Sequence, residues 1–248
     1  MILQTGPRKK VAFKNALQEK IKRLRSVYIL LLIGLPILVF QSFKLNWVSY
    51  RPAAGDEILS AVGLVKTGTG TGSAFLVSPT KLVTARHVVG NLQLGDVIKV
   101  EFVKADLLEN EVDAKVLFIS QSEARYNDYA LLELLKPIVL NPLEIGSAEE
   151  SIIGNEIAVI GYPFGSFSST KGSISNDAAF ENESVLQLYA GAWPGNSGGP
   201  VIDKQSSKVI GILLSGFEGE GKGITFAVKI DQLINDEQLQ EQKIDLLK

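Results

Sequence analysis

The sequence predicts an all-β fold in which short strands close into barrels. Glycine is frequent, with 23 residues among 248, and short runs rich in valine and isoleucine recur between turn-forming residues. Beyond the N-terminal segment about 200 residues remain, which is enough for one well-packed domain or for two small barrels. Barrels suit such short strands, because closure removes the open sheet edges.

The first half of this domain shows a series of short runs that alternate or are continuously apolar, as strands do. The expected strands span residues 62–66, 72–77, 81–84, 97–103, 112–120 and 130–134. Pro137 and Pro142 then interrupt the pattern, because proline cannot donate to a strand ladder. Residues 137–151 are therefore interpreted as the connection between two barrels.

The second half repeats the pattern, with strands expected at residues 156–161, 185–189, 200–203, 209–214 and 223–228. Residues 164–177 are rich in serine and glycine, which predicts a mobile loop. After the last strand, apolar side chains between Ile230 and Leu247 recur at near-helical spacing. This spacing predicts a C-terminal amphipathic helix, over about residues 232–248, that packs on the domain.

One glycine-rich run holds a serine in a setting that favours nucleophilic chemistry. The run is Gly195-Asn196-Ser197-Gly198-Gly199-Pro200. Glycine permits a sharp turn, which can present the Ser197 hydroxyl outward together with neighbouring backbone N–H groups. Such N–H groups stabilise an oxyanion. A serine hydroxyl remains a weak nucleophile unless a base removes its proton.

The base has one candidate, because His87 is the single histidine of the chain. A third group is expected to orient its ring, and Asp128 fits that role. It precedes the apolar residues 129–132, and an unpaired carboxylate is costly to bury. The sequence therefore predicts a catalytic set of His87, Asp128 and Ser197, in that order along the chain.

Residues 84–87, 128–132 and 195–200 resemble the three signatures of the chymotrypsin-like (trypsin-like) serine peptidases. Three further segments are similar to the HtrA/Deg-type bacterial proteases of that family: Gly161-Tyr162-Pro163-Phe164-Gly165, Lys171-Gly172-Ser173-Ile174-Ser175 and Gly223-Ile224-Thr225-Phe226-Ala227-Val228. The resemblance covers about residues 61–231, and its motifs follow the order of the family.

The resemblance implies two six-stranded antiparallel β-barrels, over about residues 61–136 and 152–229. It implies that Ser197 attacks a peptide carbonyl, that His87 accepts and returns the proton, and that Asp128 holds the ring. It places the oxyanion hole at the backbone N–H groups of Gly195 and Ser197. It also implies a homo-oligomer, since HtrA/Deg relatives are often trimers.

Substrate recognition follows from the same resemblance. A strand at residues 213–216 would pair with the backbone of a polypeptide substrate, which makes Leu214, Ser215 and Gly216 candidate binding residues. Gly191 stands where trypsin-type enzymes keep an acid, so cleavage after lysine or arginine is not expected. The specificity pocket is expected to prefer small or medium-sized apolar residues and to be lined by Ala190, Gly191, Ala192 and Thr225.

The sequence departs from the family pattern in two places. Asn196 replaces the aspartate that in many animal relatives pairs with a freshly cut N-terminal ammonium, so activation by that cut is not expected. Leu214 stands where relatives often carry serine or threonine near the catalytic aspartate. Either Ser215 is the true counterpart, or Asp128 has one hydrogen-bond donor fewer. Only about twenty residues follow the last expected strand, so a PDZ domain is not expected after it.

Composition excludes several other chemistries. The chain has no cysteine, which rules out a disulfide framework, a thiol nucleophile and cysteine-ligated zinc. With one histidine, histidine-based zinc catalysis is not expected. We therefore expect neither a metal nor an organic cofactor.

The N-terminus combines a basic and an apolar segment. Residues 1–26 carry a net charge of +7, whereas the rest of the chain carries −9. Residues 26–43 contain no charged side chain and approach the length of a membrane-spanning helix, with Trp47 and Tyr50 just beyond it, where interfacial aromatic residues are expected. We expect a basic cytoplasmic segment at 1–25, a signal-anchor helix at 26–45 and a linker at 46–60.

Two alternatives compete with the anchor. A cleaved signal peptide would have an apolar region of similar length, but its basic region would be shorter, and Ala53-Ala54-Gly55 lies far from Phe40 for a cleavage site. Binding of nucleic acid to the basic end is disfavoured, because the charges stop directly at the apolar run. The charge bias predicts a single-pass protein with its N-terminus in the cytoplasm and its remainder outside the cytoplasmic membrane, periplasmic or extracellular.

The sequence as a whole predicts a membrane-anchored serine endopeptidase that acts on polypeptides. Two alternatives remain at the same site. In the first, the fold is retained without activity, as a module that binds peptides or a partner. In the second, the catalytic set serves a non-proteolytic acyl transfer or ester hydrolysis.

Overall fold

The computed structural model describes residues 54–68, 70–105, 110–121, 127–180, 183–216 and 223–247. The chain divides into two compact units, Met1–Arg51 and Pro52–Lys248. All described residues belong to the second unit. The expected basic segment and signal-anchor helix lie outside the described residues.

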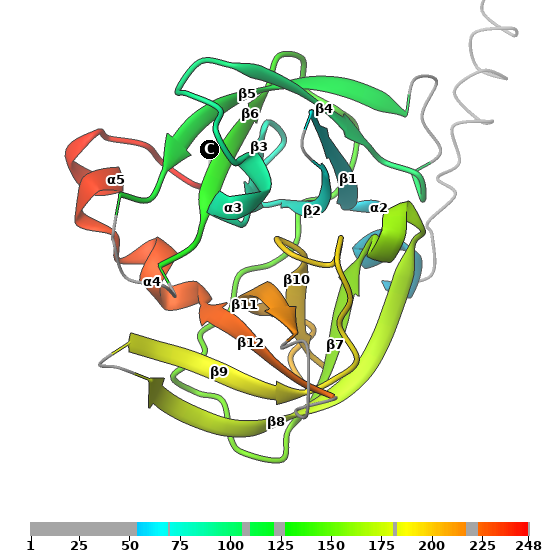
Figure 1. Cartoon of the computed structure of the whole chain (residues 1–248), viewed down its shortest axis with the longest axis vertical. Helices are drawn as coiled ribbons and strands as arrows, with labels where there is room; N and C mark the ends of the chain where they lie inside the picture. The colour runs from blue at the N-terminus through cyan, green and yellow to red at the C-terminus, as the bar shows by residue number, and fades with distance from the viewer. Residues whose placement is uncertain are drawn as a thin grey trace, which may run out of the picture. The chain divides into compact units, whose positions relative to one another are not determined.

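The first half of the described chain forms a closed antiparallel barrel with the strand order β1-β2-β3-β6-β5-β4 (Figure 1). Its strands are β1 (Val62–Thr67), β2 (Gly70–Leu76), β3 (Lys81–Thr84), β4 (Val97–Glu101), β5 (Glu111–Ile119) and β6 (Ala130–Leu134). A single turn of helix, α3 (Arg86–Val89), directly follows β3.

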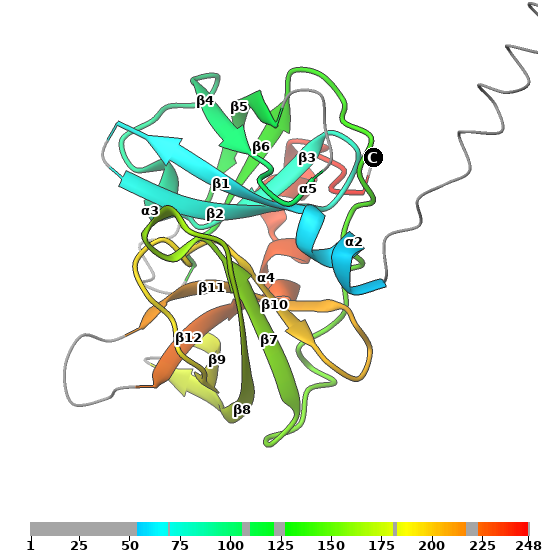
Figure 2. The same cartoon turned by 90° about the vertical axis from the view of Figure 1, so that its right-hand side faces the viewer.

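The second half forms another closed barrel, in the order β10-β11-β12-β9-β8-β7. Figure 2 shows the two barrels stacked, with α4 (Ile230–Ile234) beside both of them. The strands are β7 (Glu156–Gly161), β8 (Ser168–Phe180), β9 (Glu183–Tyr189), β10 (Pro200–Asp203), β11 (Val209–Gly216) and β12 (Ile224–Lys229). The predicted pair of six-stranded antiparallel barrels is therefore confirmed.

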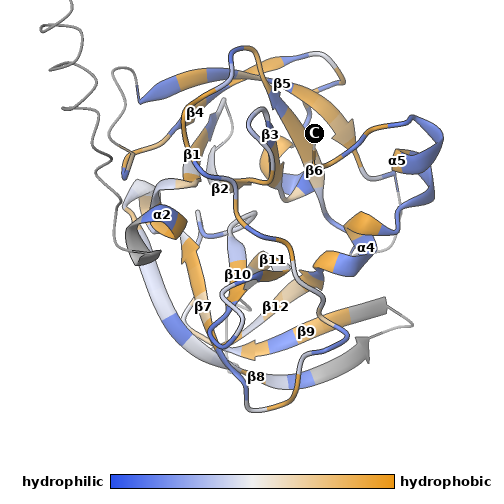
Figure 3. Cartoon of the chain, turned by 180° about the vertical axis from the view of Figure 1, so that it is seen from behind, coloured by the Kyte–Doolittle hydropathy of each residue, from blue (hydrophilic) through white to orange (hydrophobic). Residues whose placement is uncertain are grey.

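Alternating burial explains why these segments are strands. Along β5, Ala114, Val116 and Phe118 are buried while their neighbours are partly exposed, which is the period-two pattern of a strand with one face in a core. In Figure 3 the hydrophobic colour covers most of β7, whereas α5 (Glu237–Glu241) is mostly hydrophilic. Burial of the apolar faces supplies the main driving force for closing both barrels.

The expected mobile loop at residues 164–177 is wrong for most of its length. A single 3₁₀ turn, η1 (Pro163–Gly165), is followed by the thirteen-residue strand β8. This strand pairs with β7, as in Ala158 opposite Lys171, and with β9, as in Ser173 opposite Tyr189. Glycine has a low intrinsic strand preference, but one ordered strand on each side, β7 and β9, imposes the extended conformation on β8.

The expected continuous C-terminal helix is interrupted. The structure has two short helices instead, α4 (Ile230–Ile234) and α5. Asp236 separates them, because its side chain caps α5 by accepting hydrogen bonds from the N–H groups of Gln238 and Leu239. Leu233 and Leu239 are still buried, so the expected packing on the domain is retained.

The chain enters the first barrel through a helix, α2 (Ala54–Ser60), which lies within the segment expected to be a linker. Within the described ranges, no helix is long and apolar enough to cross a membrane. The expected spanning segment, residues 26–45, is not among them.

Candidate active site

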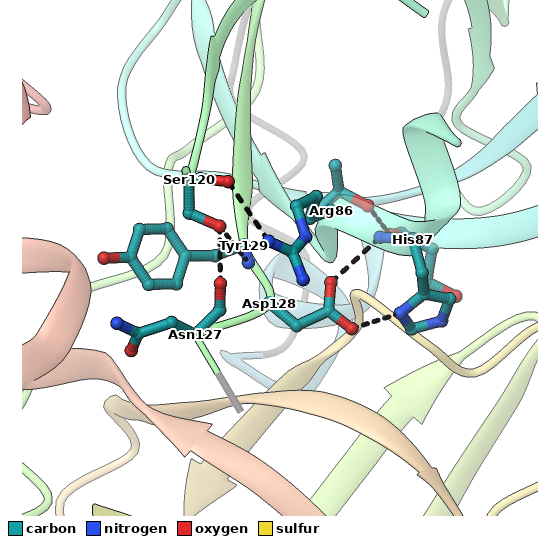
Figure 4. A network of polar contacts seen from close by, with 8 residues as sticks. Arg86, His87, Ser120, Asn127, Asp128 and Tyr129 are labelled. Atoms are coloured by element: carbon teal, nitrogen blue, oxygen red, sulfur yellow. Dashed lines mark hydrogen bonds and ion pairs between the residues drawn. The ribbon is translucent and has the colours of Figure 1, made fainter. Parts of the chain in front are cut away.

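His87 and Asp128 are joined by two hydrogen bonds. The Asp128 carboxylate lies 2.5 Å from His87 Nδ1 through Oδ2, and its Oδ1 accepts the His87 backbone N–H at 2.9 Å. Figure 4 shows both contacts from the same carboxylate. Because Asp128 holds the ring at Nδ1, the other ring nitrogen is left to exchange a proton with a nucleophile, as the predicted role requires.

Helix α3 presents the imidazole at the surface. Val88 and Val89 are buried and anchor the turn in the first barrel, whereas 46% of the His87 side chain is exposed. Within α3, His87 therefore faces the site, and the two residues that follow it face the core.

The position of Asp128 is fixed by its neighbours, which sequence reasoning missed. Ser120 binds the chain on both sides of the aspartate: its hydroxyl donates to the Asn127 carbonyl at 2.5 Å, and its N–H donates to the Tyr129 carbonyl at 3.1 Å (Figure 4). Arg86 donates to the Ser120 carbonyl at 3.3 Å. A serine at the end of a strand gives no sequence signal for this role.

Tyr129 ties the same segment to the C-terminal helices. Its hydroxyl donates a hydrogen bond to the Asp236 carboxylate, and its ring stacks on Phe118 with centroids 6.5 Å apart. Burial, followed by the interaction with Asp236, raises the pKa of the Tyr129 hydroxyl above its usual value. The hydroxyl therefore remains a donor at ordinary pH.

Ser197 lies on a loop that packs against the residues directly before His87. A Cβ added at Gly198 would stand 2.4 Å from Thr84 Oγ1 and 2.7 Å from the Ala85 nitrogen. The Gly198 backbone has φ +82°, which glycine adopts readily. Only a glycine after Ser197 thus allows this loop to reach the β3–α3 corner.

The backbone N–H groups of Gly195 and Ser197 donate to no acceptor within the described residues. Their neighbours do have acceptors: the Asn196 N–H donates to the Trp193 carbonyl at 3.0 Å, and the Gly198 N–H to the Leu213 carbonyl at 2.7 Å. Buried N–H groups are rarely left without an acceptor. These two donors are therefore available to an incoming oxyanion.

Ser73 links the two barrels directly beneath this loop, and sequence reasoning did not select it. Its hydroxyl donates to the Gly195 carbonyl at 2.7 Å and accepts the Tyr162 N–H at 3.0 Å. Its own N–H donates to the Ser197 carbonyl at 2.8 Å. Ser73 is fully buried, so its bonds to the Gly195 and Ser197 carbonyls hold the loop without competition from water.

The structure thus brings the loop of Ser197 beside the His87–Asp128 pair. No hydrogen bond joins the Ser197 hydroxyl to His87 in the described part of the chain. Catalytic hydrogen bonds are often long or poorly aligned before substrate binds. No cluster of three His, Cys, Asp or Glu side chains that could hold a metal ion occurs among the described residues.

The predicted specificity residues lie on the second barrel. Ala190 and Thr225 are buried, and Gly191 and Ala192 are half-buried. A Cβ at Gly191 would meet only Thr170 Cγ2, at 3.8 Å, so this position has room for a larger group. Their role in substrate binding stays a prediction.

Strand β11 is irregular at Leu214 and Ser215. These are the two residues that the sequence offers as counterpart of the serine or threonine that relatives carry near the catalytic aspartate. Its register with β12 shifts between Leu213 and Gly216, so the extra residue of a bulge falls at Leu214–Ser215. Leu214 is buried and brings no hydrogen-bond donor to Asp128, whereas the side chain of Ser215 lies outside the described atoms. The backbone of both residues stands at the strand expected to pair with substrate.

Residues 72–212, more than half of the chain, match the trypsin-like peptidase domain. The chain belongs to the trypsin-like peptidase family. The family segment runs from β2 through β11 and contains His87, Asp128 and Ser197.

Several curated relatives of this trypsin-like peptidase are of the DegP type. A probable periplasmic serine endoprotease, DegP-like, from Pseudomonas putida is 30% identical over 82% of this chain and 40% of its own. Its counterpart from Rickettsia prowazekii is 32% identical over 63% of this chain and 31% of its own. Protease Do-like 8 from Arabidopsis thaliana is 30% identical over 61% and 36%. These relatives confirm the HtrA/Deg resemblance, and the chain spans about a third of their length.

Solved structures show the same fold. The trypsin-like peptidase is similar to Rv3671c from M. tuberculosis in an inactive form, with a TM-score of 0.61 and 20% identity. That match covers 76% of this chain and 90% of the other. At this identity the likeness supports the two-barrel fold alone.

Proposed function

We propose that this protein is a serine endopeptidase that hydrolyses polypeptides through His87, Asp128 and Ser197. The pairing of its single histidine with Asp128, next to a loop with two unused N–H donors, carries this proposal. Family membership and the serine endoprotease relatives support it.

In the proposed reaction, Ser197 Oγ attacks the peptide carbonyl carbon while the free ring nitrogen of His87 takes its proton. The N–H groups of Gly195 and Ser197 donate to the carbonyl oxygen as it becomes negative. The C–N bond then breaks, and His87 returns the proton to the departing amine. Water hydrolyses the resulting ester in the same way, with His87 as the base. Asp128 favours the imidazolium in both steps.

We further propose that residues 26–45 anchor the protein in the cytoplasmic membrane with the peptidase outside. The charge bias and the uncharged run of the N-terminus support this topology. Membrane fractionation with protease protection tests it: the C-terminal domain should be digested from the outside only. A mature protein shorter by about 45 residues would support the cleaved signal peptide instead.

The catalytic proposal is tested with the full chain in detergent. Wild type should cleave casein or a mixed peptide library, with new termini identified by mass spectrometry, and Ser197→Ala should not. A folded wild type that binds peptides without cleaving any would favour the silent binding module. Hydrolysis of activated esters alone would favour the acyl-transfer alternative.

A further inference from the structure

Two large aromatic side chains stand exposed beside the nucleophile loop. Phe164 is 74% exposed and Trp193 is 59% exposed. Their ring centroids lie 6.2 Å apart with a tilt of 41°, so they form one apolar surface. We call these two residues the aromatic pair.

The backbone at Phe164 is unfavourable for a phenylalanine. It has φ +51° and ψ 29° within η1, a left-handed conformation that L side chains other than asparagine and aspartate rarely adopt. The Phe164 N–H donates to the Pro194 carbonyl at 2.9 Å, which ties the turn to the nucleophile loop. Because the Phe164 ring is exposed, core packing does not explain why a phenylalanine occupies this position. Strained residues of this kind occur preferentially at functional sites.

The aromatic pair lies at one end of the nucleophile loop and β11 lies at the other. Gly198 and Gly199 bond to Leu213 of β11 at 2.7 and 2.8 Å. At the opposite end, a Cβ on Gly195 would touch the Tyr162 carbonyl and the Phe164 nitrogen. The proposed strand pairing uses β11, and the expected pocket for the residue before the cut includes Thr225 on β12. A substrate that continues past the Gly195 N–H therefore reaches Phe164 with the residues that follow the cut.

We propose that Phe164 and Trp193 bind an apolar or aromatic side chain of the polypeptide substrate, at one of the two positions that follow the scissile bond. This inference rests on the proposed peptidase function. The two rings are continuous with the site where the carbonyl would bind, and aromatic side chains gain from both burial and ring packing in such a position. The exposed rings of Phe164 and Trp193 thus select the substrate residues that follow the scissile bond.

The test is a set of internally quenched peptides that share one cleavage site and vary one position at a time on both sides of it. Wild type in detergent should prefer Phe, Tyr, Trp or Leu over Ser or Asp at one of the two positions after the cut. Trp193→Ala should reduce kcat/KM for the preferred peptides about tenfold, which corresponds to one lost apolar contact. Selection before the cut should not change.

Phe164→Asn separates binding from stability. Asparagine tolerates the left-handed conformation, so thermal stability should be kept or increased while the preference after the cut is lost. Ile152→Ala is the control: Ile152 is 67% exposed, on the connection before β7, and its loss should leave the cleavage profile unchanged.

Labelling of Ser197 by a fluorophosphonate distinguishes the failure of this inference from that of the peptidase proposal, because that probe has no residues after a cut. If wild type labels and cleaves but shows no preference after the cut, or if both variants retain it, the inference is wrong. It is also wrong if the variants change only the oligomeric state or the binding to lipid vesicles. If wild type neither labels nor cleaves, the proposed function itself fails.

Discussion

The Ser73 hydroxyl donates a 2.7 Å hydrogen bond to the carbonyl of Gly195, across 122 residues of sequence and from one barrel to the other. The same oxygen accepts the Tyr162 N–H, and a Cβ at Gly161 would stand only 2.7 Å from it. The first barrel thereby determines how the nucleophile loop of the second barrel is held.

We therefore expect Ser73→Ala to slow fluorophosphonate labelling about tenfold or more and to lower stability by about 1–3 kcal/mol, because two buried groups lose a partner. Ser175→Ala is a matched control. It removes a 3.0 Å hydroxyl-to-carbonyl bond within the second barrel, so it should affect stability alone. Equal labelling rates for both variants would contradict the positioning role.

Asp128→Asn should reduce kcat by about 10⁴-fold with the fold intact, the order found for the equivalent change in related triads. The amide cannot serve as acceptor for both His87 Nδ1 and the His87 N–H as a carboxylate does. Asp203→Asn is the control, since Asp203 is also buried and accepts two bonds from Ser206 away from the site. Kinetics with one peptide substrate measure the loss of activity, and circular dichroism checks the fold. Together they distinguish the catalytic role of Asp128 from a purely structural role such as that of Asp203.

Gly195→Ala should abolish activity. The added Cβ would lie 2.3 Å from the Tyr162 carbonyl, at a φ of +102°, so the loop and its N–H donors must shift. Gly154→Ala places an alanine at a similar φ of +94°, but its Cβ would have no atom within 4 Å. This variant should lose stability while remaining active. Activity of Gly195→Ala close to wild type would show that the loop geometry is not required.

Stability should fall at alkaline pH because of Tyr162. Its burial raises the pKa of the hydroxyl to about 12, whereas an unfolded tyrosine titrates near about 10. Below pH 10 both states are neutral, and between pH 10 and 12 only the unfolded state ionises, so unfolding becomes easier as pH rises. Tyr162→Phe should flatten this decline, measured by urea unfolding as a function of pH. It should also lower stability at neutral pH, because the hydroxyl donates to the Val62 carbonyl.

The sequence predicted the barrels and the core of the site because both leave local signals. Period-two burial marks strands such as β5, and the single histidine leaves no other choice of base. It missed β8, whose polar residues become a strand only through pairing with β7 and β9. It also placed one helix where Asp236 starts a second.

Ser73, Ser120 and the aromatic pair were beyond sequence reasoning for a related reason. Ser73 acts across 122 residues of sequence, on Gly195, and Phe164 of η1 contacts Trp193 of the nucleophile loop. Ser120 acts on Asn127, seven residues away, and on Tyr129, across a turn between two strands. A serine in a strand or an aromatic residue in a loop is common, and only the three-dimensional arrangement distinguishes these.

The most direct test of the proposed catalytic set is fluorophosphonate labelling of the full chain in detergent, with the modified residue identified by mass spectrometry. We expect wild type to be labelled at Ser197 alone and Ser197→Ala and His87→Ala to be unlabelled, with all three proteins folded by circular dichroism. A folded wild type that resists the probe, or labelling that persists without Ser197 or His87, would contradict the proposed catalytic set.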